Sequence, residues 1–180
     1  ESLDRRIAVQ VNEYLSPASK MVQLAADIID EPSYGVENRA DLEILGMPIL
    51  AAYPQLTTFN VAVPSGEFLM LKKMPDGSIH SKNIEVSETG RRVNWTRRDV
   101  QNKVVKVEEI ADDPYDPRVR PWYIGAQEDQ RIFWTDVYIF FTDQAPGITV
   151  STPIYDQDKK LRGVIGVDMK LAELSTFLAG

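Results

Sequence analysis

Cysteine is absent from this sequence, and histidine occurs only once, as His80. The chain therefore has no disulfide, no thiolate nucleophile and no cysteine zinc site, and a single histidine cannot form a histidine cluster. Basic residues are also in deficit, because 20 lysines and arginines face 27 acidic residues and leave a net charge of -7. A negative chain is repelled by phosphate backbones and anionic lipid headgroups, so nucleic acid is not an expected partner.

Long hydrophobic runs are missing as well. None approaches the roughly 20 residues needed to cross a bilayer, and the start at Glu1 shows no signal-peptide pattern. If the chain belongs to a membrane protein, we expect the anchoring segments to lie outside these residues. The 180 residues, 43% of them hydrophobic, fit one domain with an appended helix.

Two stretches have the apolar spacing of helices. The first thirty residues predict a long helix with one apolar stripe, formed by Leu3, Ile7, Val11, Tyr14, Met21, Leu24 and Ile28. Ser16 and Pro17 interrupt it, which predicts either a kink or two abutting helices. A second helix is expected over residues 40–52, ending at Tyr53 and Pro54.

From Thr57 onwards the pattern changes to short segments rich in β-branched and aromatic residues, separated by turn residues. The expected strands are residues 57–63, 68–74, 78–83, 91–97, 103–107, 147–155 and 161–169. The last two predict a hairpin across residues 156–160, and a short helix is expected over residues 171–178. This order predicts an α+β fold, with helices gathered on parts of an antiparallel sheet.

The most informative stretch is residues 115–123, which read Tyr-Asp-Pro-Arg-Val-Arg-Pro-Trp-Tyr. Prolines hold the backbone, while arginine and aromatic side chains offer planar donors and apolar faces that suit a small polar ligand. A guanidinium can bind a carboxylate through two parallel hydrogen bonds. The alternative is that Trp122 and Tyr123 are core residues and that Arg120 pairs with a structural acid.

This run resembles the hallmark of the double Cache or PDC sensor domains. These domains lie outside the membrane in bacterial chemoreceptors, histidine kinases, diguanylate cyclases and adenylate cyclases. Residues 134–138, 147–155 and 161–169 follow in the order and spacing of that family, so the resemblance covers nearly the whole chain.

The resemblance implies a PAS-like antiparallel sheet of about five to seven strands flanked by helices. It also implies a division into a signalling and dimerisation helix, residues 1–30, and a ligand-binding module, residues 31–180. The module would be the membrane-distal one of two, in the extracytoplasmic part of an inner-membrane protein.

Members of the family that sense amino acids carry a dispersed motif, which is matched here by Tyr115, Arg120, Trp122, Tyr123, Tyr138 and Asp168. By resemblance, Arg120 and the Trp122 indole N–H face the ligand carboxylate. Tyr123 and Tyr138 close the pocket, and Tyr115 with Asp168 receives the ammonium group. Phe140 replaces the second acid that these sensors usually have, which favours a more hydrophobic ligand. For Asp168 the alternative is a cap on the helix that follows it.

Other polar residues have ordinary structural interpretations. Asp112, Asp113 and Asp116 are expected to cap turns instead of holding a metal, and residues 156–158 to form a hairpin turn. The arginines at positions 91, 92, 97 and 98 are expected on a solvated face, and His80 is expected to be exposed. Neither a cofactor nor a metal is expected.

Three functions remain at this point. The first is a sensor module that binds a small metabolite, an amino acid, amine or small carboxylate, as a homodimer formed through the N-terminal helix. The alternative is a ligand-independent dimerisation or spacer module. An enzyme is the least expected, because only carboxylate pairs remain as candidate catalytic groups.

Overall fold

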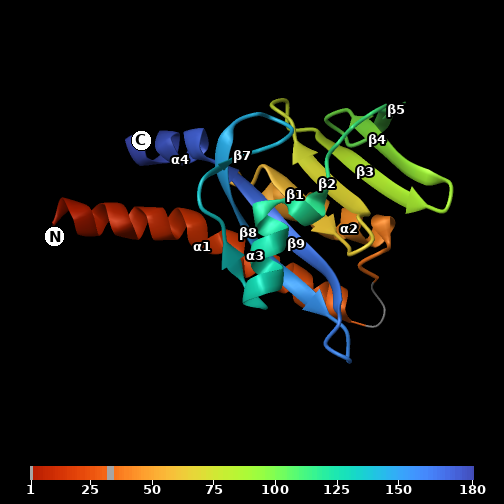
Figure 1. The fold of residues 1–180 in the computed structure, drawn as a ribbon. Coiled ribbons are helices and arrows are strands. Elements are labelled where there is room, and N and C mark those ends of the chain that lie inside the picture. Colours follow the sequence, from red (N-terminus) through yellow and green to blue (C-terminus); the bar gives the residue numbers. More distant parts are fainter. Residues whose placement is uncertain (1, 32–34) are drawn as a thin grey trace.

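A computed structural model describes residues 2–31 and 35–180. The elements in chain order (Figure 1) are α1 (Leu3–Asp30), α2 (Arg39–Ala52), β1 (Thr58–Ala62), β2 (Phe68–Lys73), β3 (Ile79–Ser87), β4 (Gly90–Arg98), β5 (Val104–Glu109), the 3-10 turn η1 (Pro117–Val119), α3 (Pro121–Asp129), β6 (Phe133–Trp134), β7 (Tyr138–Ile139), β8 (Pro146–Tyr155), β9 (Leu161–Lys170) and α4 (Leu171–Ala179).

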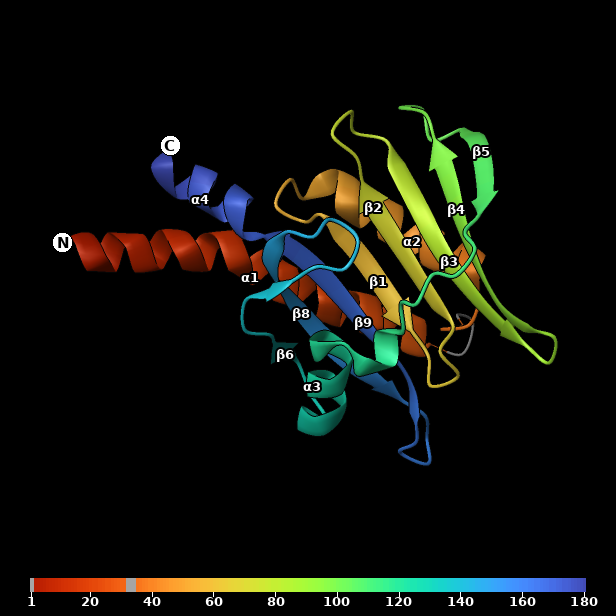
Figure 2. The ribbon, with the colours of Figure 1, turned by 45° about the horizontal axis from the view of Figure 1, so that its top comes forward.

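In the described part of the chain the strands form one nine-stranded antiparallel sheet (Figure 2). Its order is β5-β4-β3-β2-β1-β9-β8-β6, and β7 also pairs with β8. The α+β prediction is confirmed, and every expected strand is present. The sheet exceeds the expected five to seven strands because β6 and β7 have 2 residues each, too few to leave a period in the sequence.

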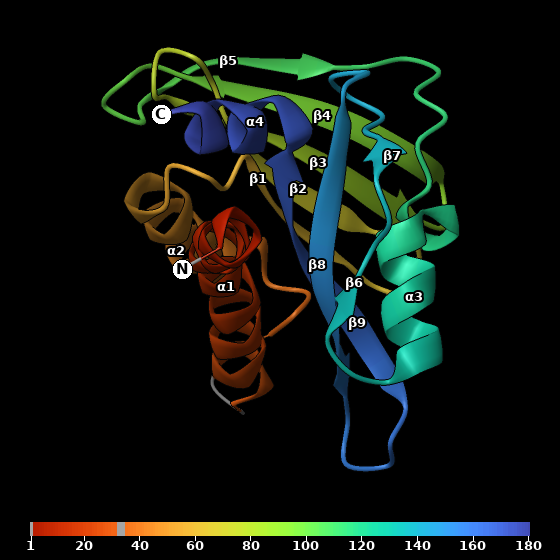
Figure 3. The same ribbon diagram turned by 90° about the vertical axis from the view of Figure 1, so that its left-hand side faces the viewer.

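The sheet has a different environment on each face, as β1 shows. Phe59 and Val61 are buried in the core that includes residues of α1 and α2, whereas Ala62 belongs to a second core that includes α3. Figure 3 shows α1 and α2 on one side of the sheet and α3 on the other. Burying a side chain such as Phe59 stabilises the fold by roughly 1.5–3 kcal/mol, so the alternation of β1 determines which face the helices cover.

Helix α1 corrects two expectations. It is one helix that continues through Pro17, so the prediction of two abutting helices is wrong. Its buried side is Tyr14, Ala18, Val22, Ala25, Ala26 and Ile29. Leu3 and Leu24 of the predicted stripe are 69% and 48% exposed. Leu3 lies where α1 extends beyond the sheet, and Leu24 points away from the side of the helix that packs on β8 and β9. Residues 2–10 are exposed and extend beyond the sheet (Figure 1).

Helix α3 was not expected, because its first residue, Pro121, belongs to a segment that reads as a loop. A proline fits the first turn of a helix, where its missing N–H has no helical partner. The helix ends at Gln130, whose φ of 56° is left-handed. Pro121 thus begins a helix that covers the face of the sheet opposite α1 and α2.

Two expectations about solvated side chains are also wrong. His80 is half-buried, with Nε2 3.1 Å from the carbonyl oxygen of Arg98. Arg98 is itself buried and donates to Ile79 and Ser81, because β4 turns this side chain inward while Arg91 and Arg92 stay exposed. The predicted hairpin turn is confirmed, since Asp156 Oδ1 accepts the N–H groups of Asp158 and Lys160, each at 2.9 Å.

Candidate functional site

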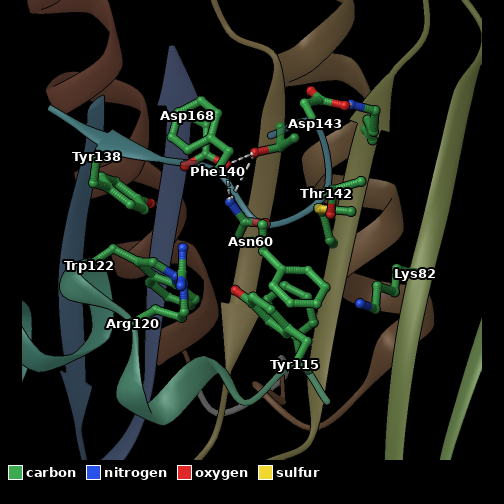
Figure 4. A pocket seen from close by; sticks show the side chains of 15 residues that line it. Asn60, Lys82, Tyr115, Arg120, Trp122, Tyr138, Phe140, Thr142, Asp143 and Asp168 are labelled. Atoms are coloured by element: carbon green, nitrogen blue, oxygen red, sulfur yellow. Dashed lines mark hydrogen bonds and ion pairs between the residues drawn. The ribbon is translucent and has the colours of Figure 1, made fainter. Parts of the chain in front are cut away.

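A small cavity lies on the face of the sheet opposite α1 and α2 (Figure 4). Its volume is about 30 Å³, which is small for a ligand pocket. Its lining is Thr58, Asn60, Phe68, Met70, Lys72, Lys82, Tyr115, Arg120, Trp122, Tyr138, Phe140, Phe141, Thr142, Asp143 and Asp168. All the predicted site residues except Tyr123 are therefore brought together, and their own side chains nearly fill the space.

The floor of the cavity is set by the register of the strands. Thr58 of β1 pairs with Lys72 on one side and with Asp168 on the other, and Asp168 pairs with Thr149 of β8. In the next row, Asn60 pairs with Met70, which pairs with Lys82. Since alternate residues of a strand share a face, these polar side chains meet on one surface.

Sequence reasoning missed this floor, although one signal was present. Polar residues occupy alternate positions in the predicted strands, at Thr58 and Asn60 of β1 and at Lys72 and Lys82 of the next two strands. Alternation indicates a shared face, but the register that places the three strands side by side involves residues far apart in the chain.

The aromatic wall comes from the segment that leads into α3. Trp122 is only 2% exposed and lies over Gly166, where an added Cβ would be 3.2 Å from the indole ring. The Ser151 hydroxyl holds it in place by donating to the Trp122 carbonyl oxygen at 2.7 Å. Tyr115 packs between Phe68 and Phe141, with ring centroids 5.0 and 5.1 Å away.

Asp168 is the buried anion of the cavity. Its carboxylate accepts hydrogen bonds from the hydroxyls of Thr58 and Thr149 and, at 3.1 Å, from the amide of Asn60. Burial raises the pKa of Asp168 above the ordinary value, although these hydrogen bonds oppose the shift. The interpretation of Asp168 as a helix cap is wrong, because the residue that precedes the first turn of α4 is Lys170.

Arg120 is the matching cation. Its Nη2 donates to the carbonyl oxygen of Ile139 at 2.9 Å, and its guanidinium lies 5.6 Å from the ring centroid of Tyr138. Within residues 2–31 and 35–180 no acidic side chain forms a salt bridge with Arg120, so the predicted alternative of a structural ion pair is not found. The guanidinium is left with donors for another group.

The remaining predicted residues divide between the cavity and the core. Tyr138 donates or accepts a 2.6 Å hydrogen bond with Thr149, and burial raises the pKa of its hydroxyl. Phe140 packs edge-on against Tyr138, with centroids 5.2 Å apart. Tyr123 is 3% exposed in the second core and does not line the cavity, a position that fits the alternative of a packing residue.

Two of the three aspartates of the proline-rich segment, Asp113 and Asp116, have structural partners, as expected. Asp113 lies 2.7 Å from Nζ of Lys82 and accepts the N–H of Tyr115 at 2.9 Å. Burial alone would raise the pKa of Asp113, but the hydrogen bonds from Lys82 and Tyr115 hold it below the ordinary value. Asp116 accepts the N–H of Arg118 at 3.0 Å and starts η1.

Comparison with known proteins decides the family. Residues 69–176 match the family described as methyl-accepting chemotaxis protein-like, first PDC sensor domain.

The chain belongs to this family.

One curated relative of this PDC domain is the methyl-accepting chemotaxis protein PscA of Pseudomonas syringae pv. tomato, 30% identical over 119 residues. The match covers 66% of this chain and 18% of PscA, so the chain spans about a fifth of that relative.

Among solved structures, the chain resembles the ligand-binding domain of the Pseudomonas aeruginosa amino acid chemoreceptor PctC in complex with GABA. The identity is 18% and the TM-score 0.66, over 97% of this chain and 63% of that one. The Campylobacter jejuni chemoreceptor Tlp3 with L-valine gives 20% identity and a TM-score of 0.64, over 97% and 60%. The chain thus spans less than two thirds of either structure, and at this identity the likeness shows the shared fold.

Membership of the family has direct consequences. The PDC domain is a non-enzymatic sensor domain of the chemoreceptor type, and such domains lie outside the cytoplasm.

No helix within residues 2–31 and 35–180 is both long and apolar enough to cross a membrane. The same residues contain no cluster of three acidic or histidine side chains placed to hold a metal ion.

Proposed function

We propose that this PDC domain binds an α-amino acid, or a closely related amine or small carboxylate, in the cavity between Arg120 and Asp168. The observation that supports this most directly is that Arg120 and Asp168, neither of which forms a salt bridge with another described residue, lie on one small cavity. An α-amino acid carries the complementary pair of charges on adjacent atoms.

The energetics favour a ligand with both charges. Burying a carboxylate is costly, and that cost appears here as the raised pKa of Asp168, caused by its burial. A ligand ammonium beside Asp168 relieves this cost, and the ligand carboxylate pairs with Arg120. Charge-assisted hydrogen bonds of this kind contribute about 1.5–3 kcal/mol each.

The aromatic residues have supporting roles in this proposal. Trp122 and Tyr115 form walls with an apolar face and one polar hydrogen each, and Tyr138 lies over the guanidinium. Phe140 adds an apolar ring at the place where amino-acid sensors have a second acid. The proposed ligand is therefore held by its charges at Arg120 and Asp168 and enclosed by rings elsewhere.

The small cavity sets a further requirement. A space of about 30 Å³ is far smaller than the several hundred Å³ of an ordinary ligand pocket. The segment that contains Phe140, Phe141 and Asp143 therefore has to move when a ligand enters. Sensor domains use such ligand-linked shifts to change the population of signalling states.

We further propose that residues 1–30 form the signalling and dimerisation helix and that residues 31–180 form the membrane-distal module of a periplasmic or extracellular receptor region. The exposed apolar residues Leu3 and Ile7 on the free part of α1 support a helix partner. Sedimentation of the Leu3→Lys, Ile7→Lys double variant tests this point. A wild-type monomer, or a dimer that the double variant keeps, would overturn it.

Calorimetry with a panel of amino acids, amines and small carboxylates tests the binding site itself. We expect at least one compound to bind the wild-type domain, and Arg120→Ala to weaken it by about tenfold or more, equivalent to about 1.4 kcal/mol. Arg118→Ala is the matched control, because Arg118 lies two positions away, is exposed and does not line the cavity. A wild-type domain that binds nothing in the panel would instead favour the spacer function.

A further inference from the structure

Lys82 of β3 is a second cation of the cavity that the proposed function does not use. Its side chain is only 3% exposed, and its Nζ lies 2.7 Å from Asp113 Oδ2. The same nitrogen lies 4.8 Å from the ring centroid of Tyr115 and 5.1 Å from that of Phe141. An ammonium group has three donors, and Asp113 is the one hydrogen-bonding partner of Lys82 in the described part of the chain.

Lys82 lies across the cavity from Arg120 and Asp168, where the charged groups of the proposed ligand are bound. Three strand steps, from β9 through β1 and β2, separate Asp168 from Lys82, or about 14 Å of sheet at the usual strand spacing. Figure 4 shows Lys82 on the opposite side of the cavity from Arg120, Trp122 and Asp168. A ligand whose zwitterion lies between Arg120 and Asp168 therefore directs its side chain over β1 and β2 towards Lys82.

Beyond Asn60 of β1, the path towards Lys82 is lined mainly by apolar side chains. Phe68 and Met70 of β2 line it from the sheet, and Tyr115 and Phe141 line it from above. Such a channel accommodates methylene groups, and a charged group at its far end meets Lys82. Phe140 does not obstruct this path, because it packs on Tyr138 beside β8.

The balance of charge is also uneven. Lys72, Lys82 and Arg120 line the cavity together with the carboxylates of Asp143 and Asp168. Adding the salt-bridge partners Asp113 and Lys170 leaves the same excess of one positive charge. A neutral zwitterion keeps this excess in a buried site, whereas a ligand with net charge -1 removes it.

We infer that Lys82 is a specificity-determining residue for an acidic α-amino acid, and that its ammonium group binds the side-chain carboxylate of the ligand. This inference rests on the proposed function, in which Arg120 and Asp168 bind the α-carboxylate and α-ammonium groups. The setting of Lys82 supports it: burial lowers the pKa of Lys82 despite the nearby Asp113, and a second carboxylate opposes that shift.

Matched ligand pairs test the inference on the unaltered domain. L-glutamate and L-glutamine have the same shape but differ by one negative charge, as do L-aspartate and L-asparagine. Calorimetry at neutral pH is expected to show the acidic member of at least one pair binding about tenfold or more tightly than its amide. Equal or tighter binding of both amides, with Arg120→Ala still abolishing it, would overturn the role of Lys82 and leave the proposed function intact.

A variant then assigns the preference to one side chain. Lys82→Met is expected to remove most of the preference for the acidic ligand while changing amide binding less than about threefold. The Lys82→Met, Asp113→Asn double variant repeats the measurement without an unpaired buried carboxylate, should the single variant fold poorly. Lys106→Met is the control, because its side chain is 62% exposed on β5.

Two further outcomes keep the hypotheses separate. A preference for the acidic ligand that survives in both Lys82 variants would overturn the role of Lys82. Absence of binding by all four amino acids, together with the rest of the panel, would overturn the proposed function itself.

Discussion

Nζ of Lys170 lies 2.9 Å from Oδ2 of Asp143, and this ion pair joins the segment above the cavity to the residue from which α4 begins. The other oxygen of Asp143 pairs with Lys72 on the cavity floor. Burial alone would raise the pKa of Asp143, but the hydrogen bonds from Lys72 and Lys170 outweigh it and hold the pKa below the ordinary value. The segment is thus clamped by two lysines from two strands.

Replacing the clamping carboxylate is expected to destabilise the domain. Asp143→Asn removes the salt-bridge partner of Lys72, whose side chain is 9% exposed, and we expect the free energy of unfolding to fall by about 1–3 kcal/mol. Urea unfolding measures the change. The control is Lys170→Gln, whose side chain is 28% exposed and whose loss costs about 1 kcal/mol or less. Equal losses in the two variants would show that Lys72 does not depend on Asp143.

The raised pKa of Asp168 predicts an unusual pH dependence of the ligand-free domain. Burial makes the folded state hold the Asp168 proton more tightly than the unfolded chain does. Above the ordinary carboxyl pKa of about 4, the folded state therefore binds more protons, and the free energy of unfolding falls as pH rises towards the raised value.

Asp168→Asn removes this titration. We expect the ligand-free variant to lack this decline and to be at least as stable as the wild type at neutral pH, while its affinity for an amino acid falls by about tenfold or more. Thermal unfolding across mildly acidic to neutral pH measures the first effect and calorimetry the second. If the unfolding free energies of the two proteins changed with pH in parallel, the decline would not be due to Asp168.

The buried pair of Lys82 and Asp113 is expected to be strongly coupled. Asp113→Asn keeps an acceptor for the Tyr115 N–H but leaves the Lys82 charge unpaired, which we expect to cost about 2–4 kcal/mol of unfolding free energy. Adding Lys82→Met is expected to recover part of this loss. A double-mutant cycle by urea unfolding checks it, with an expected coupling of about 0.5–3 kcal/mol. Additive single effects would mean that the two side chains do not pair in solution.

Gly147 determines where Phe140 lies. A Cβ at Gly147 would be 2.2 Å from the Phe140 ring and 2.6 Å from the carbonyl oxygen of Met169, so side chain and backbone both have to shift. We expect Gly147→Ala to lower the free energy of unfolding by about 1–3 kcal/mol, measured by urea unfolding. Gly35→Ala serves as control, since the nearest atom to its added Cβ is 3.5 Å away. A loss no larger than that of the control would contradict the close packing of Phe140.

Local patterns were sufficient for most elements of this fold. The strands from β1 to β5 and the hairpin of β8 and β9 follow from period-two segments and from turn residues such as Asp156, whose side chain accepts its own turn N–H groups. Helix α3 was missed because a proline that begins a helix and a proline that ends one look alike in the sequence. Arg120, Trp122 and Asp168, which the family motif singles out, line one cavity.

The sequence by itself thus determined the α+β order, the family and most of the residues that meet at the site. Only the tertiary structure decided that Lys72 and Lys82 join them, that Tyr123 lies in the core, and that Asp168 is buried among hydroxyl and amide donors. The physical reason is that alternation within a strand assigns a side chain to one of two faces. The pairing register between strands, set by packing of the whole sheet, decides which side chains share that face as neighbours.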